Sequence, residues 1–238
     1  MDELILGIDS TAQTGSVFLS RGETLLAESL LNVRSTHSER LLSCVDQLCQ
    51  QAGIAMKDLH ALAAVVGPGS FTGLRTGLAT VKALSLALGL PVVTATSLEL
   101  LGHALPYASC PVACMIDARK KQVYAALYGW HRGGMETILA PRVVNPELLL
   151  EKLKGDCLFV GDGAMQYRSL IVRSRGDQAL FAPVDRHQVR ASFGLGLFLE
   201  RLRNGETFDA HSLRPLYIRP SDAELGNCMP DEIVSIEG

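Results

Sequence analysis

The chain has 238 residues, 47% of them hydrophobic, which is enough for one large domain or two small ones with a substantial core. Its net charge of −3 argues against a protein that binds nucleic acid by phosphate contacts alone. No apolar run approaches the ~20 residues of a membrane span and no basic leader is visible, so we expect a cytoplasmic protein, without membrane contact, whose six cysteines are reduced.

The first half of the chain predicts three strands, followed by alternating helices and strands. The strands cover residues 4–9, 16–19 and 24–30, and a helix over 37–52 follows the capping-box pattern of Thr36 and Glu39. An apolar strand over 60–66 leads into a glycine-rich turn and a helix that ends at Gly89. A strand over 91–94 and a helix between Thr96 and Pro106 complete this half.

The second half opens like the first. Residues 112–117 are again an apolar run that ends in Ile-Asp, and a polar turn and a strand over 122–128 follow. A helix over 146–153, a strand over 157–160, a further helix, a strand near Phe181 and a helix over 192–203 come next. The repeat predicts a duplicated α/β unit, with subdomains at 1–106 and 107–221 and a flexible tail at 222–238.

Asp9 ends the first strand opposite a glycine-rich turn, where α/β folds gather ligand groups. The amides of that turn precede a helix and so form a candidate anion site. The candidate nucleotide or anion loop comprises Asp9, Ser10, Thr11, Gly67, Gly69 and Ser70. The simpler explanation, which the sequence alone favours because no second acid accompanies Asp9, is that this side chain binds the amides of its own turn.

Patterns typical of catalysis or metal binding are missing from the sequence. The glycine-rich turn is neither a Walker A motif nor GxGxxG, and no GxSxG nucleophile motif occurs. The histidines are scattered, and Cys110 and Cys114 would lie roughly 13 Å apart in a strand. The sequence therefore predicts no catalytic residue, no metal and no cofactor.

The run from Val65 to Gly77, VVGPGSFTGLRTG, together with Ala79, Lys82 and the later Leu90-Pro91-Val92, closely resembles the bacterial TsaB (YeaZ) family. The segments that also agree are 7–11 with 16–17, 36–42, and 117–119 with 123–124. Residues 161–163 and 215–219 agree more weakly. The resemblance implies an α/β fold of the actin/hexokinase-like (ASKHA) class with two duplicated RNase H-like subdomains, in line with the repeat.

The resemblance also implies a function. Family members are non-catalytic subunits needed for threonylcarbamoylation of the adenosine next to the anticodon in tRNA. They act as dimerisation partner and activator of a TsaD-type transferase. A TsaE-type ATPase joins the complex, the subunit alone forms a homodimer, and tRNA binds only through the complex. The metal-binding histidine pair of the transferase falls near Ser97 and Leu101, neither of which can replace an imidazole ligand.

Two functions of other classes remain open: a glycoprotease-like hydrolase and a small-molecule kinase of the ASKHA fold. The missing metal pair weakens the first, and the missing second acid beside Asp9 weakens the second.

The helix over 72–88 has two charges, Arg75 and Lys82, and two stripes of apolar or small residues. The stripe that suits its own sheet is Leu74, Leu78, Val81, Leu84 and Leu88. The second stripe, with two residues of the first helix, is the expected partner interface: Thr76, Ala79, Thr80, Ala83, Ala87, His37 and Leu41. Burial of this stripe by another part of the same chain is the alternative.

Overall fold

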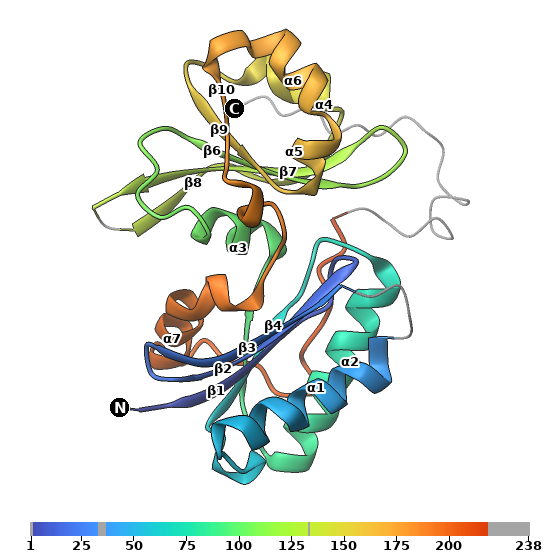
Figure 1. Cartoon of the computed structure of the whole chain (residues 1–238), viewed down its shortest axis with the longest axis vertical. Coiled ribbons are helices and arrows are strands. Elements are labelled where there is room, and N and C mark those ends of the chain that lie inside the picture. The colour runs from blue at the N-terminus through green and yellow to red at the C-terminus, as the bar shows by residue number, and fades with distance from the viewer. Residues whose placement is uncertain (1, 33–36, 133, 219–238) are drawn as a thin grey trace.

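The computed structural model describes residues 2–32, 37–132 and 134–218, and of residues 31, 32 and 37–40 the backbone alone. Two β-sheets lie one above the other along the long axis of the molecule, with helices between and outside them (Figure 1). Thr36 of the predicted capping box, the side chain of His37 and the tail at 222–238 lie outside this description.

The first sheet has the strand order β3-β2-β1-β4-β5. Strands β1, β2 and β3 are antiparallel neighbours, and β4 and β5 continue the sheet parallel to β1. Helices α1 and α2 cover one face, and α3 leads out of this half. The bounds are β1 Leu4–Asp9, β2 Thr14–Arg21, β3 Thr24–Asn32, α1 His37–Ala52, β4 Ala61–Val65, α2 Phe71–Leu88, β5 Val92–Ala95 and α3 Ser97–His103.

The second sheet repeats this topology, with the order β8-β7-β6-β9-β10 and the same pattern of antiparallel and parallel pairs. The match of every strand to its counterpart confirms the predicted duplication. The bounds are β6 Val112–Asp117, β7 Val123–His131, β8 Gly134–Val144, α4 Pro146–Lys152, β9 Cys157–Val160, α5 Asp162–Gln166, α6 Arg168–Arg175, β10 Ala179–Phe181 and α7 Leu195–Arg203.

The central strands β1, β4 and β6 are mainly apolar because both of their faces are buried. In β1, Leu6 and Ile8 contribute to the core under α1 and α2, whereas Ile5 belongs to the core between the two sheets. That middle core joins residues of both halves, including Phe18, Val112 and Phe198. The two sheets are therefore packed on one shared hydrophobic layer.

Local signals place most helix ends correctly. Ser70 caps α2 by accepting a hydrogen bond from the amide of Gly73, and Gly89 ends the helix in the left-handed conformation, with φ of 67°. Thr96 and Glu99 form the expected capping box of α3. Strand β8 was not predicted, since it is a sheet edge with Pro141 and many exposed positions, which weakens the alternation that marks a strand.

The chain after β10 returns to the first sheet. Phe198 of α7 stacks on Phe18 of β2, with ring centroids 6.1 Å apart. Further on, Phe208 and Val92 exchange backbone hydrogen bonds at the β5 edge, and the amide of Leu216 donates to the carbonyl of Val66 over 2.7 Å. Residues 191–218 thus pack on the first sheet. The division into subdomains at residues 1–106 and 107–221 stays a prediction.

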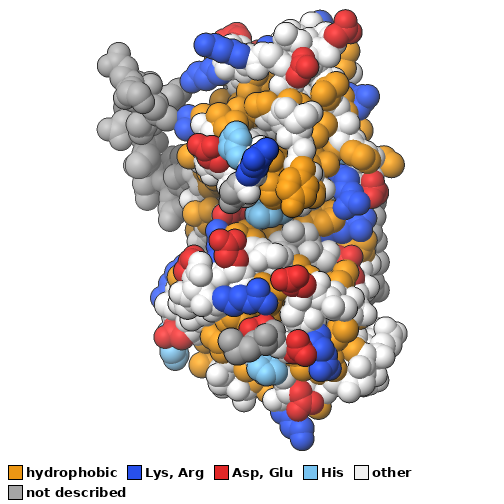
Figure 2. Space-filling view, turned by 90° about the vertical axis from the view of Figure 1, so that its left-hand side faces the viewer, with side chains coloured by type: hydrophobic (Ala, Val, Ile, Leu, Met, Phe, Trp, Pro, Cys, Tyr) orange, Lys and Arg blue, Asp and Glu red, His pale blue; other side chains and the backbone are white. Residues whose placement is uncertain are grey.

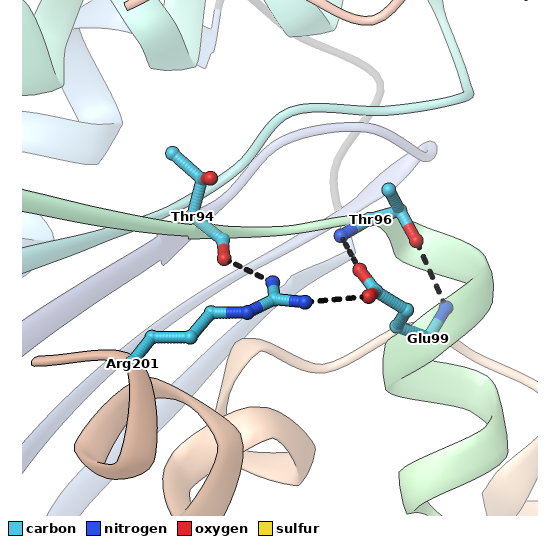
Figure 3. Close-up of polar contacts among 4 residues, drawn as sticks. All are labelled: Thr94, Thr96, Glu99 and Arg201. Atoms are coloured by element: carbon cyan, nitrogen blue, oxygen red, sulfur yellow. Dashed lines mark hydrogen bonds and ion pairs between the residues drawn. The ribbon is translucent and has the colours of Figure 1, made fainter. Parts of the chain in front are cut away.

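An ion pair joins this returning segment to the helix that links the two halves (Figure 3). The guanidinium of Arg201 in α7 donates to a carboxylate oxygen of Glu99 in α3 over 2.7 Å and to the carbonyl of Thr94 over 2.5 Å. The other carboxylate oxygen of Glu99 accepts from the amide of Thr96. Both charged side chains are largely shielded from solvent, so this ion pair is part of the packing between α7 and α3.

Among the helices of the described residues, none has the length and apolar character needed to cross a membrane.

Candidate functional site

Asp9 lies at the end of β1 and is fully buried. Its Oδ1 accepts a hydrogen bond of 2.9 Å from the amide of Thr11, as the simpler explanation of this residue predicts. Its Oδ2 has no hydrogen-bond partner among the described residues. Burial raises the pKa of Asp9 from 3.8 to about 6, against the opposing effect of hydrogen bonds from Thr11 and Ser10.

The turn after Asp9 packs directly on α2. The hydroxyl of Ser10 donates to the carbonyl of Gly73 over 2.7 Å, and the amide of Ser70 donates to the carbonyl of Thr11 over 2.6 Å. A Cβ atom on Gly69 would lie 2.2 Å from the carbonyl oxygen of Thr11, and one on Gly73 would lie 2.0 Å from that of Ser10. The glycines of this run are therefore required by close packing of the first turn on the helix.

A cavity of about 470 Å³ lies between the two sheets, next to this turn. Thr11, Gly69 and Ser70 of the predicted anion loop line it, whereas Asp9, Ser10 and Gly67 are not part of its wall. The hydroxyl oxygen of Thr11 is closed off from solvent, and the Thr11 side chain acts with the Thr11 amide to lower the pKa of Asp9. The loop residues thus divide into a group that faces the cavity and a group that supports it.

The second half supplies the opposite wall of the cavity, which the sequence analysis missed. Asp117, Arg119 and Asp162 line it, and Oδ1 of Asp162 accepts a 3.1 Å hydrogen bond from the amide of Asp117. His187 also lines it, but its Nδ1 accepts from the amide of Gly161 and its Nε2 bonds the carbonyl of Ala182. The repeated Ile-Asp run and the Gly161-Asp162-Gly163 segment were the available signals for this wall.

The outer face of α2 exposes mostly small and apolar residues, with the exposed Thr72 and Arg75 near its start. Ala79, Ala83 and Ala87 of the predicted stripe are exposed, and Thr76 is half-buried. Leu86, which the prediction did not include, has 60% of its surface exposed. The leucine and valine stripe of the same helix packs inward as predicted, since Leu74, Leu78, Val81 and Leu84 are buried and Leu88 is half-buried.

Two residues of the predicted interface point inward. Thr80 is buried, and its hydroxyl donates to the carbonyl of Thr76 one helical turn earlier. Leu41 is buried in the core under α1, whereas its neighbour Leu42 is exposed. Each lies on the buried side of its helix, so these two residues do not offer surface to a partner.

The two positions matched to the transferase histidines are both in the interior. Ser97 is fully buried and its hydroxyl donates to the carbonyl of Pro68, and Leu101 belongs to the core between the sheets. Within the described residues, no three His, Cys, Asp or Glu side chains are grouped as a metal site would require.

Comparison with known proteins places this architecture in a family. Residues 25–193 match the model of the TsaD family, described as tRNA N6-adenosine threonylcarbamoyltransferase. The tRNA threonylcarbamoyladenosine biosynthesis protein TsaB of Bacillus subtilis is 30% identical over 223 residues, which cover 92% of this chain and 96% of that protein. TsaB of Escherichia coli is 29% identical, covering 90% of this chain and 94% of that protein. The structure of YeaZ from Pseudomonas aeruginosa is 27% identical and superimposes with a TM-score of 0.77 over 90% of this chain and 99% of that one.

Proposed function

The chain belongs to the TsaB (YeaZ) family with the actin/hexokinase-like fold, and we propose that it acts in threonylcarbamoyladenosine biosynthesis on tRNA. Within that process its role is non-catalytic: it associates with a TsaD-type transferase and activates modification of the adenosine next to the anticodon. A TsaE-type ATPase is the third component, a second copy is the partner when the subunit is alone, and tRNA is held through the complex. The setting is the cytoplasm.

The exposed face of α2 is the observation that carries this proposal. A helix that covers a sheet ordinarily has polar residues outside, and α1 exposes mainly polar residues, Ser43, Asp46 and Gln47, with Leu42 as the apolar exception. Helix α2 exposes Arg75 near its start and then Ala79, Ala83, Leu86 and Ala87. Small residues let a second helix approach closely, and Leu86 adds apolar surface that gains from leaving water. This face suits a helix-on-helix contact with another subunit.

The interior positions of Ser97 and Leu101 support a non-catalytic role. A metal site at these two positions would need two ligand side chains and open space, whereas both residues are closely packed. The hydrolase alternative loses support for the same reason. The kinase alternative loses support because Asp9 is fully buried and lies outside the cavity wall.

A second candidate function is retained binding of a small anionic ligand, such as a nucleotide, in the cavity between the sheets. The start of α2 favours it, because Gly69, Ser70 and Phe71 bring the positive end of a helix dipole to the cavity wall. The exposed guanidinium of Arg119 lines the same cavity. Calorimetric titration with ADP of the wild type and an Arg119→Gln variant tests this candidate.

Reconstitution tests the main proposal. The chain is mixed with a TsaD-type transferase, a TsaE-type ATPase, the threonylcarbamoyl donor and tRNA, and modified adenosine is measured by mass spectrometry of digested tRNA. We expect modification to fall to background when this chain is omitted and no modification by this chain alone. Transfer by the isolated chain would show that it is an enzyme, and full activity without it would remove the activator role.

A further inference from the structure

The exposed side of α2 carries positive charge and no acid. Its exposed face consists of residues at intervals of three or four, which is one side of a helix: Arg75, Ala79, Ala83 and Leu86. Lys82 lies half-buried beside this face, and the 18 residues of α2 include no Asp or Glu. In residues 41–52 of the neighbouring helix α1, the charged residue is Asp46, which accepts a hydrogen bond from the side chain of Gln50. The side of the molecule shown in Figure 2, by contrast, mixes acidic and basic side chains over both halves. The exposed face of α2 is therefore apolar with positive charge.

The described part of the chain ends at the start of this face. The ring of Tyr217 packs on that of Phe71, with ring centroids 5.5 Å apart. The guanidinium of Arg75 lies 3.9 Å from the centre of the Phe71 ring, and its Nε donates to the hydroxyl of Tyr217 over 3.4 Å. The chain beyond residue 218 therefore continues from a point that is held against the beginning of α2.

The tail, residues 222–238, is complementary to the exposed face of α2 in charge and in apolar character. It contains five acids and no Lys or Arg. Its apolar run Ile233, Val234 and Ile236 directly follows the acids Asp231 and Glu232. The exposed face rises about 17 Å along the helix axis from its first residue to its last, a distance that about five extended residues span. The chain after residue 218 is therefore long enough to turn and run back along α2.

We propose that the tail covers the exposed face of α2 in the free subunit and is displaced when a partner subunit binds there. This inference rests on the proposed function, which gives the face its partner. Burial of the apolar run against the small residues of α2 supplies attraction, and the acids beside Arg75 and Lys82 set the direction of the contact. Because the tail is tethered, its effective concentration at the face is on the order of millimolar, so a weak contact suffices. The tail thereby competes with the transferase and with a second copy, and it raises the concentration at which either one associates.

Disulfide crosslinking within the isolated full chain tests whether the tail lies on this face. Cys228 belongs to the tail, and Ala83→Cys places a thiol on the exposed face of α2. Cys110→Ser is added as background, because the other cysteines of the described residues are buried. Under mild oxidation of dilute protein we expect a disulfide within one chain, identified by mass spectrometry of the digest and by monomer mobility on a non-reducing gel. Ser174→Cys, exposed on α6 of the second half, is the control and should crosslink about tenfold more slowly.

Exchange of charges tests the direction of the contact. Lys82→Glu should slow the crosslinking of the tail by about two- to fivefold for each lost charge pair, and Asp231→Lys/Glu232→Lys should do the same. The combination of all three substitutions restores opposite charges and should recover most of the wild-type rate. Added salt should slow the wild type in the same way. No recovery in the combined variant would show that these charges do not face each other.

Association measurements test the competition. Asp231→Asn/Glu232→Gln weakens the tail contact without touching α2, so self-association and binding to the transferase should both tighten by about fivefold, whereas the control Glu151→Gln on α4 should change neither. Ultracentrifugation and calorimetric titration give the two affinities. Equal crosslinking at positions 83 and 174 would overturn docking of the tail, and unchanged or weaker association of the neutralised variant would overturn the competition. A wild-type chain that binds no transferase would contradict the proposed function, whereas crosslinking in the isolated chain decides the position of the tail separately.

Discussion

The turn that follows β1 approaches α2 so closely that side chains cannot lie between them. Gly69, Gly73 and Gly77 are spaced four residues apart, and a Cβ atom on any of them would overlap Ser10 or Thr11. The glycine-rich run that carries the family resemblance therefore has a packing role. Comparing this run with the motifs of phosphate-binding loops does not reveal that role.

Substitution of these glycines should be costly for this reason. In Gly73→Ala the new methyl group would start 2.0 Å from the backbone carbonyl oxygen of Ser10, which cannot move without displacing β1. We expect a loss of about 3 kcal/mol in the free energy of unfolding, measured by urea denaturation. Gly196→Ala is the matched control, because that helical glycine has no atom within 4 Å of the added Cβ. This control should gain about 0.5 to 1 kcal/mol from helix propensity. Equal effects of the two variants would refute the packing role.

Asp9 makes the stability of the protein depend on pH in an unusual direction. Its raised pKa means that the folded protein holds a proton between about pH 4 and 6 that the unfolded chain has released. Stability contributed by this group is therefore present at low pH and falls as the pH rises through 6. The size of the penalty above pH 6 is about 3 kcal/mol at most.

Asp9→Asn should remove that penalty while its side-chain oxygen still accepts from the amide of Thr11. We expect the variant to melt at a higher temperature than the wild type at pH 7.5 and at nearly the same temperature at pH 4. Scanning calorimetry across this range checks the prediction, with the exposed Asp177→Asn as control. Parallel pH profiles for wild type and Asp9→Asn would show that Asp9 is not the responsible group.

Helix α2 has two apolar sides with different roles. One side packs on the sheet with Leu78 and Val81, and the other presents Ala79, Ala83 and Leu86 to solvent. Because Ala79 and Ala83 are exposed, a charge placed there points to solvent in the monomer.

Ala83→Glu should abolish association while leaving the fold intact. An unpaired charge in a buried interface costs several kcal/mol, about 3 or more, whereas an exposed one on a helix costs little. We expect a folded monomer by circular dichroism and gel filtration, with tRNA modification lost in the reconstituted system. Ser174→Glu, which adds the same charge on the exposed side of α6, should remain associated and active. Unfolding of Ala83→Glu would mean that the face is internal, and a fully active, associated variant would mean that it is bare surface.

The segment after β10, which returns to the first sheet, links the two halves of the molecule. Helix α7 packs on the first sheet after the chain has completed the second, and Arg201 bonds both Thr94 of β5 and Glu99 of α3 (Figure 3). Burial acts to raise the pKa of Glu99, but the hydrogen bonds from Arg201 and Thr96 outweigh it, so this pKa is below its usual value. The pair therefore contributes stability that is present at neutral pH and is lost as Glu99 becomes protonated in acid.

Replacement of Arg201 by methionine, an apolar side chain of similar length, tests this contribution. Arg201→Met should lower the free energy of unfolding by roughly 1 to 3 kcal/mol at pH 7, because Glu99 keeps its shielded charge without a partner. The deficit should shrink below about pH 4, where the carboxylate is neutral. Chemical denaturation at both pH values gives the comparison, with the exposed Arg173→Met as control. A deficit independent of pH would indicate lost packing instead of a lost ion pair.

The sequence by itself determined the features that depend on neighbouring residues. The repeated Ile-Asp runs revealed the duplication, Gly89 marked the end of α2, and the spacing of Leu74 to Leu84 identified its buried side. Helix caps and amphipathic periods are encoded within a few residues, so no knowledge of the fold is needed to recognise them.

Only the tertiary structure decided which distant residues meet. Ser10 forms a hydrogen bond with Gly73, which lies 63 positions away in the sequence. Asp162 belongs to the second half, and the packing of the two sheets brings it to the cavity wall opposite Thr11. The return of α7 to the first sheet was equally invisible, because its apolar face would fit either sheet. Such choices follow from the combined packing of all elements, which no single segment of the sequence contains.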